Sequence, residues 1–501
     1  MNNSTAVCSI HPITDELKAT PGGLVSRHDP VTIDFDSPND PTNPVNWSTA
    51  YRWSMVILIS VMSLVVNLAI LMCAPATPHI LQEFHSDDQL KATLLVSIWE
   101  LGEVFGPLLI GPLSEMYGRL PIYHAANVTF IVFSAIAAES RSINMLIGCR
   151  LVLGISVAST VLNPSIVGDM FHAENRGRAM AVMGMTPFIA PVLGPIIGAL
   201  ISEAKGWRWT FWIVTIVTAA FEVIFAITYR ESYRVVILQR TARRSQIQTG
   251  EHIGQLRNLR SENGFPNTSR IKLLCQSLCR PLKLPFTSLA VLLVSISCAI
   301  GLSYMYVIIT NLTNIFQQVY GFGEREVGLT YLGLGFGTIS SAIFTGLFLD
   351  WYLKRKSAYN HAPGPEHRLP PMLFGNLLVP LGVIGFGWTV AARTPWIVPI
   401  LCTAVTGFGF VSISLSAWSY VVDAFGIYAA SATAAVTVVR NIAAAVLPLA
   451  SPPLLARLGP GWGMTVLGLV ALLLSPLPVV ILRRSRKSGG EDESSSRGET
   501  G

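Results

Sequence analysis

The chain has little charge for its length. Asp, Glu, Lys and Arg make up only 13% of its 501 residues, whereas a soluble domain usually carries about 25%. Hydrophobic residues account for 51% of the sequence, and its mean hydropathy is +0.51. The shortage of charge indicates that much of the chain lies in a lipid bilayer rather than in water.

Catalytic and metal-binding motifs are also missing. The seven cysteines form no Cys-x-x-Cys pair and no zinc spacing. No nucleophile elbow, His-Glu-x-x-His motif or phosphate-binding loop is present. The basic residues behind the net charge of +6 fall in loops between apolar runs, which does not suit nucleic acid. We therefore expect no enzyme activity, no cofactor, no metal and no nucleic-acid partner.

Apolar runs of about 20 residues, the length that spans a bilayer as a helix, are abundant. They are continuous rather than alternating, which favours helices over barrel strands. The polar, mixed-charge N-terminus is not a cleavable signal peptide. The sequence thus predicts an all-α integral membrane protein with twelve transmembrane helices, near 54–74, 92–112, 121–138, 145–166, 179–202, 209–229, 287–311, 327–350, 371–392, 396–420, 427–450 and 460–482.

The runs form two groups of six, which suggests two equivalent halves around a midplane site. Lys and Arg concentrate in alternate loops and in the C-terminal tail, which places both termini in the cytoplasm. The polar central stretch is interpreted as a solvated linker. The expected divisions are an N-terminal tail, a first bundle, a cytoplasmic loop, a second bundle and a C-terminal tail, at 1–53, 54–229, 230–286, 287–482 and 483–501.

A glycine-rich motif follows the second run as Gly111-Pro-Leu-Ser-Glu115-Met-Tyr-Gly118-Arg119. Its glycines permit a tight turn between helices. Its carboxylate can cap a neighbouring helix N-terminus and pair with an arginine. The motif resembles the signature of the major facilitator superfamily, with Glu115 in the usual Asp position. A degenerate copy in the second half carries Asp350, Lys354 and Arg355, as an internal duplication predicts.

Two further elements match the same superfamily. Arg150 to Gly154 resembles its Arg-x-x-x-Gly element, which implies an arginine linked to proton transfer. The alternative is a structural arginine bonded to backbone carbonyls. The fifth run is similar to the superfamily's antiporter motif, although alanine replaces its first and last glycines. That motif is carried by Pro191, Gly194, Pro195 and Gly198; small residues four apart also permit simple close packing of helices.

Several longer stretches narrow the resemblance. DPTNPVNWS (40–48), GWRWTFW (206–212) and PEHRLPPMLFG (365–375) are similar to segments of fungal drug:proton antiporters with twelve spans. The likeness extends from about residue 38 to 483. It implies a proton-coupled exporter of small amphipathic molecules, such as drugs, toxins or fungal secondary metabolites. It also implies a monomeric multi-pass protein of the plasma membrane, with the bilayer, protons and a small-molecule substrate as partners.

Ionisable residues inside apolar runs are expected to be functional. Glu100 and Glu103 lie three apart on one helix face and could form a proton site, a cation site or a helix-packing network. Glu222 could equally be structural, and Arg440 could face an anionic substrate or a glutamate. The near-cytoplasmic Asp169, Arg176 and Asp423 are assigned to the gate with the glycine-rich motifs. Candidate cavity residues are Trp99, Tyr304, Tyr306, Asn311, Trp418, Tyr420 and Asn441.

Two alternatives to drug export remain open at this stage. The paired glutamates would also suit an exporter of polyamines or other organic cations. A membrane receptor on a transporter fold is a third possibility, although the intact loop motifs and Arg150 favour a working transporter. The sequence does not identify the substrate, and the direction of transport rests on the resemblance.

Overall fold

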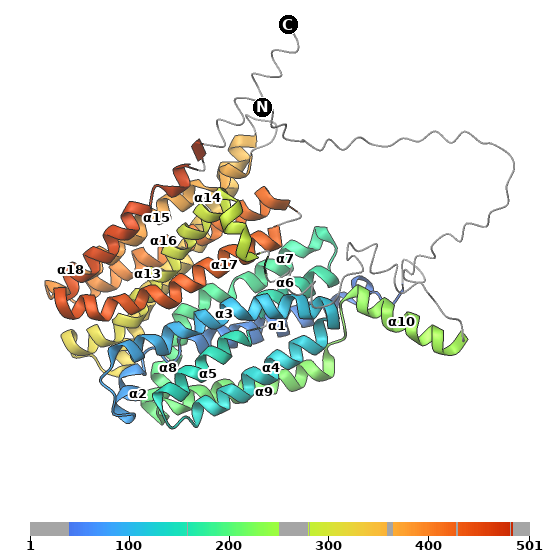
Figure 1. Ribbon diagram of the computed structural model, residues 1–501, viewed down its shortest axis with the longest axis horizontal. Coiled ribbons are helices and arrows are strands. Elements are labelled where there is room, and N and C mark those ends of the chain that lie inside the picture. Colours follow the sequence, from blue (N-terminus) through green and yellow to red (C-terminus); the bar gives the residue numbers. More distant parts are fainter. Residues whose placement is uncertain are drawn as a thin grey trace, which may run out of the picture.

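The computed structural model describes residues 40–157, 159–249, 279, 281–357, 364–426, 429–480 and 482–483. Its described elements are all helical, with no strand among them (Figure 1). The N-terminal half contains η1 (Pro44–Asn46), α1 (Thr49–Leu71), α2 (Thr77–Glu83), α3 (Gln89–Tyr117), α4 (Arg119–Ala138), α5 (Ile143–Ile155), α6 (Ser159–Met170), α7 (Ala173–Gly184), α8 (Thr186–Lys205), α9 (Arg208–Thr228) and α10 (Arg234–Thr249).

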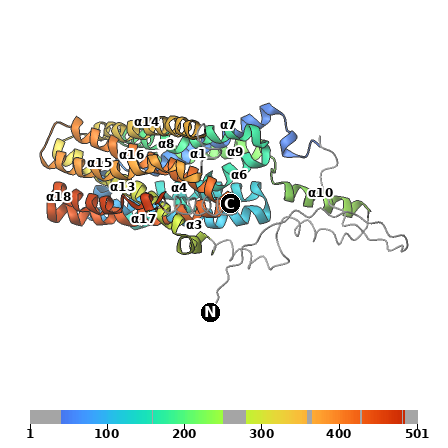
Figure 2. The same cartoon turned by 90° about the horizontal axis from the view of Figure 1, so that it is seen from above.

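The C-terminal half repeats this arrangement with longer helices. It contains α13 (Leu289–Tyr320), α14 (Glu324–Ser357), η2 (Pro365–Arg368), α15 (Pro370–Ala391), α16 (Ile397–Phe425), α17 (Ala429–Val446), η4 (Leu447–Ala450) and α18 (Ser451–Leu474). The two halves lie side by side and are seen as the blue-to-green and yellow-to-red groups of helices (Figures 1 and 2). They meet where α3 packs on α17 and α8 packs on α14.

The described helices account for twelve passes through a membrane. Ten segments are long and apolar enough to span it. One of them, Ser431–Val480, leaves helical geometry at Gly459 (φ 73°, ψ 171°) and so divides into two passes. The remaining pass is the broken pair α5 and α6, where a single continuous helix was expected. The predicted fold class, an all-α membrane protein with two six-helix bundles, is therefore confirmed.

The bundle has two ends that differ in their polar contacts. We call the end that carries α2 the closed end, because hydrogen bonds and an ion pair join the two halves there. Thr313 Oγ1 donates to the Ala74 carbonyl at 3.2 Å, Asn314 donates to Gln89 at 2.9 Å, and a 3.1 Å ion pair joins His79 on α2 to Glu324 on α14.

We call the opposite end, where α1 and α4 begin and α10 leaves the bundle, the gate end (Figures 1 and 2). Two ion pairs lie there, Arg119–Asp169 at 3.3 Å and Arg368–Asp423 at 2.8 Å. Each of these pairs joins residues of the same half. Polar contacts at the closed end thus join the two halves, whereas each ion pair at the gate end lies within one half.

The beginning of the central stretch differs from the solvated linker that the sequence suggested. Glu231 and Ser232 are only 7% and 0% exposed, and α10 follows them as a helix. That part of the interpretation is wrong, because a polar composition says nothing about packing against a helix terminus. Residues 250–278 of the same stretch lie outside the described residues.

Candidate functional site

Two carboxylates lie inside the bundle on α3. Glu100 and Glu103 are 5% and 8% exposed, and their spacing of three places both on the face of α3 that looks into the bundle. A buried carboxylate requires hydrogen bonds or a counter-charge. Each of the two has its own hydrogen-bond donor.

Glu100 is bonded across the two halves of the molecule. Tyr306, on α13 of the C-terminal half, donates its hydroxyl to Glu100 Oε1 at 2.5 Å. Tyr306 is itself only 3% exposed. The sequence predicted Glu100 and Tyr306 separately, and the structure brings them into direct contact at the centre of the bundle.

Glu103 is bonded within its own helix. The indole Nε1 of Trp99, one turn earlier on α3, donates to Glu103 Oε1 at 3.0 Å. Trp99 is completely buried and packs edge-on against Phe130 of α4. Trp99 was expected to shape the cavity, but it lies behind Glu103 and holds it in place.

Arg440 of α17 lines the same cavity as both carboxylates. Its Nε donates to the amide oxygen of Asn441 at 3.0 Å, and its guanidinium lies 5.9 Å from the Trp418 ring centre. These two contacts orient the side chain without neutralising it. Among the described residues no ion pair joins Arg440 to either glutamate, so its role as their counter-charge stays a prediction.

A cavity of about 360 Å³ connects these groups. It lies between the halves, because α1, α3, α6, α7 and α8 line it from one side and α13, α16 and α17 from the other. Its charged lining consists of Glu100, Glu103 and Arg440, and the rest is mainly apolar with a few hydroxyl and amide groups. Among the lining residues are Asn67, Met183, Pro191, Met305, Tyr306, Phe410 and Trp418.

Arg150 lies apart from the cavity lining and is completely buried. Its guanidinium donates to the carbonyls of Leu95 at 3.0 Å, Ala69 at 2.9 Å and Ile70 at 2.6 Å. Its carbon Cζ also lies 4.8 Å from the centre of the Trp99 ring. The contacts are those of the structural alternative, although Trp99 connects Arg150 to Glu103.

Close packing of α3 on α5 sets this arrangement. A methyl group added at Gly102 would lie 2.4 Å from the Leu151 carbonyl oxygen, and one at Gly154 would lie 2.3 Å from the Trp99 carbonyl oxygen. Only glycine permits helix backbones to approach so closely. The glycine of the Arg-x-x-x-Gly element thus brings Arg150 against Trp99.

The antiporter motif on α8 has a packing role in this structure. A methyl group at Gly198 would lie 2.1 Å from the Met72 carbonyl oxygen, and one at Gly194 would lie 3.0 Å from that of Leu68. On another face of α8, Ala199 contacts Gly328 of α14. The motif therefore allows α8 to fit between α1 and the other half, and Pro191 also reaches the cavity lining.

Other candidates lie away from the cavity. Glu222 of α9 accepts a hydrogen bond from Asn127 at 2.6 Å and pairs with His124, both on α4. Tyr304 donates to the Leu467 carbonyl between α13 and α18, and Asn311 bonds to Ser451 at 2.8 Å. These contacts join neighbouring helices. Tyr420, also buried, is absent from the cavity lining.

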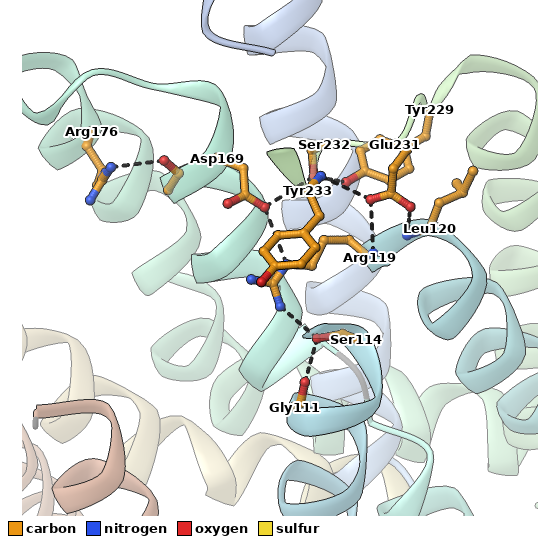
Figure 3. A network of polar contacts seen from close by, with 11 residues as sticks. Gly111, Ser114, Arg119, Leu120, Asp169, Arg176, Tyr229, Glu231, Ser232 and Tyr233 are labelled. Carbon is orange, nitrogen blue, oxygen red and sulfur yellow. Dashed lines mark hydrogen bonds and ion pairs between the residues drawn. The ribbon is translucent and has the colours of Figure 1, made fainter. Parts of the chain in front are cut away.

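The polar network at the gate end is centred on Arg119 rather than on Glu115 (Figure 3). Arg119 donates to Ser114 at 2.7 Å and pairs with Asp169 at 3.3 Å, and it lies 4.7 Å from the centre of the Tyr233 ring. Burial raises the pKa of Asp169 to about 6, although Arg119 acts in the opposite direction. Glu115 is exposed.

Sequence reasoning missed the carboxylate that caps α4. Glu231 accepts from the backbone N–H groups of Arg119 at 3.0 Å and Leu120 at 3.3 Å (Figure 3), as expected for a carboxylate at a helix N-terminus. A methyl group on Gly118 (φ 104°) would lie 2.3 Å from Glu231. Only its place directly after the sixth span could have indicated it. Arg176 donates to the Gly168 carbonyl at 2.9 Å.

The second half has a matching pair that the degenerate motif did not reveal. Asp350, Lys354 and Arg355 are exposed, and the ion pair joins Arg368 to Asp423 instead. Arg368 lies just before α15 and Asp423 lies near the end of α16. They correspond to Arg119 and Asp169, which lie at the start of α4 and near the end of α6.

Comparison with known proteins places the geometry in context. The family pattern described as Major Facilitator Superfamily matches residues 57–448. The MFS-type transporter tndD of Aspergillus flavipes is 36% identical over 491 residues, covering 96% of this chain and 90% of its own. The efflux pump radE of Floropilus chiversii is 36% identical over 458 residues, covering 91% and 84% respectively.

Solved structures of transporters share the fold. The E. coli xylose transporter XylE, in a partially occluded inward-open conformation, superposes with a TM-score of 0.61 at 15% identity, covering 85% of this chain and 97% of its own. At such low identity the likeness concerns the arrangement of helices alone.

Proposed function

The chain belongs to the major facilitator superfamily of small-molecule transporters, which are not enzymes, and on that premise we propose that it is a proton-coupled antiporter that exports small amphipathic molecules. The similarity to a protein named an efflux pump supports export. The observation that carries the proposal is the buried pair Glu100 and Glu103 in a cavity between both halves.

Antiport requires that protons and substrate oppose each other's binding, because binding couplings between two ligands are reciprocal. Carboxylates in the substrate cavity provide such a coupling when the substrate uses the ionised form. Release of protons from Glu100 or Glu103 then prepares the cavity for substrate, and protonation expels it. Alternate opening of the gate end and the closed end would expose the same cavity to each side of the membrane.

An organic cation is the second candidate substrate, and the lining charges favour it over an anion. Two carboxylates face one guanidinium, that of Arg440. A cation would compete with protons for the carboxylates, as antiport demands. An anion on Arg440 would instead bind more tightly once the carboxylates were protonated, which is the coupling of a symporter.

We further propose that the protein is a monomer in the plasma membrane. Its gate end then faces the cytoplasm. The Lys and Arg residues of the loops at that end support this orientation. It makes the conformation described here one that is closed towards the outside.

Proteoliposomes test the proposal. With an acidic lumen, the wild type should accumulate a lipophilic cationic dye and, more weakly, a neutral dye of similar size, and addition of a protonophore should release both. Glu103→Gln should reduce accumulation at least tenfold, whereas Glu139→Gln, at an exposed position after α4, should not. Accumulation without a pH gradient, or an unaffected Glu103→Gln variant, would contradict proton coupling through this site.

A further inference from the structure

Trp99 contacts both the cavity carboxylate Glu103 and the buried guanidinium of Arg150. Its ring faces the Arg150 guanidinium, with Cζ 4.8 Å from the ring centre, while its Nε1 donates to Glu103 at 3.0 Å. The indole therefore contacts a guanidinium with its ring face and a carboxyl group with its N–H. The side chain is completely buried, so neither interaction is weakened by water.

Arg150 in turn holds the end of α1. Ala69 and Ile70 belong to the last turn of α1, whose carbonyls have no partner within the helix. Arg150 donates to both, at 2.9 and 2.6 Å, and its positive charge lies at the negative end of the helix dipole. Arg150 thus caps α1 from a neighbouring helix.

The chain that follows this cap forms the closed end. Ala74 accepts the hydroxyl of Thr313 from the other half at 3.2 Å, and His79 pairs with Glu324 at 3.1 Å. The position of the α1 terminus therefore determines whether these bridges can form. A continuous set of contacts leads from Glu103 through Trp99 and Arg150 to the closure.

We infer that Trp99 is a positioning residue through which the charge on Glu103 controls the closed end. An ionised Glu103 accepts a stronger hydrogen bond from the indole than a neutral one does. The ionised, empty carrier then keeps Trp99 beneath Arg150 and the closed end sealed. Protonation of Glu103 weakens this hold and permits the closed end to open, so that an empty, unprotonated carrier does not cycle.

The inference rests on the proposed function only in taking Glu103 as a proton-binding group. Other charged and titratable groups face Glu103 as well: Glu100 on α3, Arg440 on α17, Tyr306 on α13, and Arg150 on α5 behind Trp99. Only Trp99 bonds directly to Glu103 and also touches Arg150, which is why a change at Trp99 separates this route from general electrostatics.

Disulfide crosslinking at the closed end provides the test. Gln89 and Asn314 lie on opposite halves, with their side chains 2.9 Å apart and exposed to solvent. In the double variant Gln89→Cys/Asn314→Cys, the fraction crosslinked by a brief oxidant pulse should rise several-fold between pH 5.5 and 8. The crosslinked fraction at each pH is divided by the thiol reactivity of the two single-cysteine variants at that pH.

Trp99→Phe keeps a ring beside Arg150 but removes the N–H donor. We expect this variant to lose most of the pH dependence of crosslinking. Adding Trp99→Phe to Glu103→Gln should then change the crosslinked fraction no further than Glu103→Gln alone. The matched control is Trp388→Phe, which loses an equivalent bond to Thr465 at 3.0 Å on the exposed face of α15 and should behave like the wild type.

The possible outcomes separate the role of Trp99 from proton binding at Glu103. If Trp99→Phe retains full pH dependence while Glu103→Gln loses it, Trp99 is not the link, although proton binding at Glu103 stands. If Glu103→Gln retains it, proton binding at Glu103 itself is wrong. Should Trp99→Phe fail to fold, Arg150→Lys tests the same route, because lysine cannot cap both α1 carbonyls in the same way; full pH dependence there would overturn the inference.

Discussion

At the scale of single residues, the position of each cavity carboxylate depends on the side chain that donates a hydrogen bond to it. Glu100 and Glu103 are adjacent on α3, yet one bonds across the molecule to Tyr306 and the other bonds along its own helix to Trp99. Spacing and hydropathy could identify both acids as residues facing the bundle interior. Their partners could not be identified from the sequence, because Tyr306 is distant in the chain and its contact depends on how the halves pack.

Arg150 illustrates the same limit. The cost of burying a guanidinium predicts that it must have partners, but not which ones. In the structure its partners are backbone carbonyls of α1 and α3. Every residue has a carbonyl, so the sequence cannot indicate which ones accept these hydrogen bonds. The family resemblance implied a role in proton transfer, and that role stays a prediction.

The buried carboxyl group of Asp169, at the gate end, gives a prediction about how protein stability depends on pH. Burial raises its pKa to about 6 from a usual 3.8, so the folded state binds the proton more tightly than the unfolded state. Protein stability should therefore increase as pH falls through 6, by up to roughly 3 kcal/mol at about 1.4 kcal/mol per pKa unit.

Thermal unfolding of the purified protein in detergent at pH 5 and pH 7.5 measures this dependence. Asp169→Asn, which cannot titrate, should remove a large part of the gain at low pH. A difference between the two pH values that is identical in the wild type and the variant would show that Asp169 does not contribute.

At the scale of helices, contacts between small residues determine where functional side chains lie. Gly102 of α3 and Gly154 of α5 let the two backbones meet, and Gly198 does the same for α8 and α1. The sequence correctly placed most of the spans, since their length and hydropathy are sufficient signals. It did not predict the break between α5 and α6, which lacks a proline or a polar run to mark it.

A substitution at Gly102 tests this packing. In Gly102→Ala the new methyl group would lie 2.4 Å from the Leu151 carbonyl oxygen, and a helix backbone cannot yield without moving α5 and Arg150. We expect a loss of roughly 1–3 kcal/mol of stability and a reduced rate of transport.

The control is Gly148→Ala on the same α5, where no atom of another helix lies within 4 Å of the added methyl group. Its melting temperature should equal or exceed that of the wild type, since alanine favours helices. Equal melting temperatures for both variants would contradict the claim that the approach of α3 to α5 requires glycine.

At the scale of the whole molecule, the two halves share a design that the sequence revealed only in part. The repeated glycine-rich motif correctly suggested an internal duplication, but it indicated Asp350, Lys354 and Arg355 as the second gate. The structure instead pairs Arg368 with Asp423, in positions that match Arg119 and Asp169. The two ion pairs lie at corresponding helix ends, and this correspondence becomes visible only from three-dimensional positions.

The contacts between the two halves at the closed end depend on a short part of the chain. The polar contacts between halves at that end are few, and they depend on the short segment after α1. The cavity and its carboxylates lie between the halves, so a change of charge there acts on both halves together.

The central claim is that substrate and protons exchange at Glu100 and Glu103. The most direct measurement is the proton release that accompanies substrate binding to purified protein in a weakly buffered solution with a pH-sensitive dye. The account predicts release of protons by the wild type near neutral pH, and little or none by Glu100→Gln/Glu103→Gln. Substrate binding without proton release by the wild type, or equal release by the double variant, would contradict it.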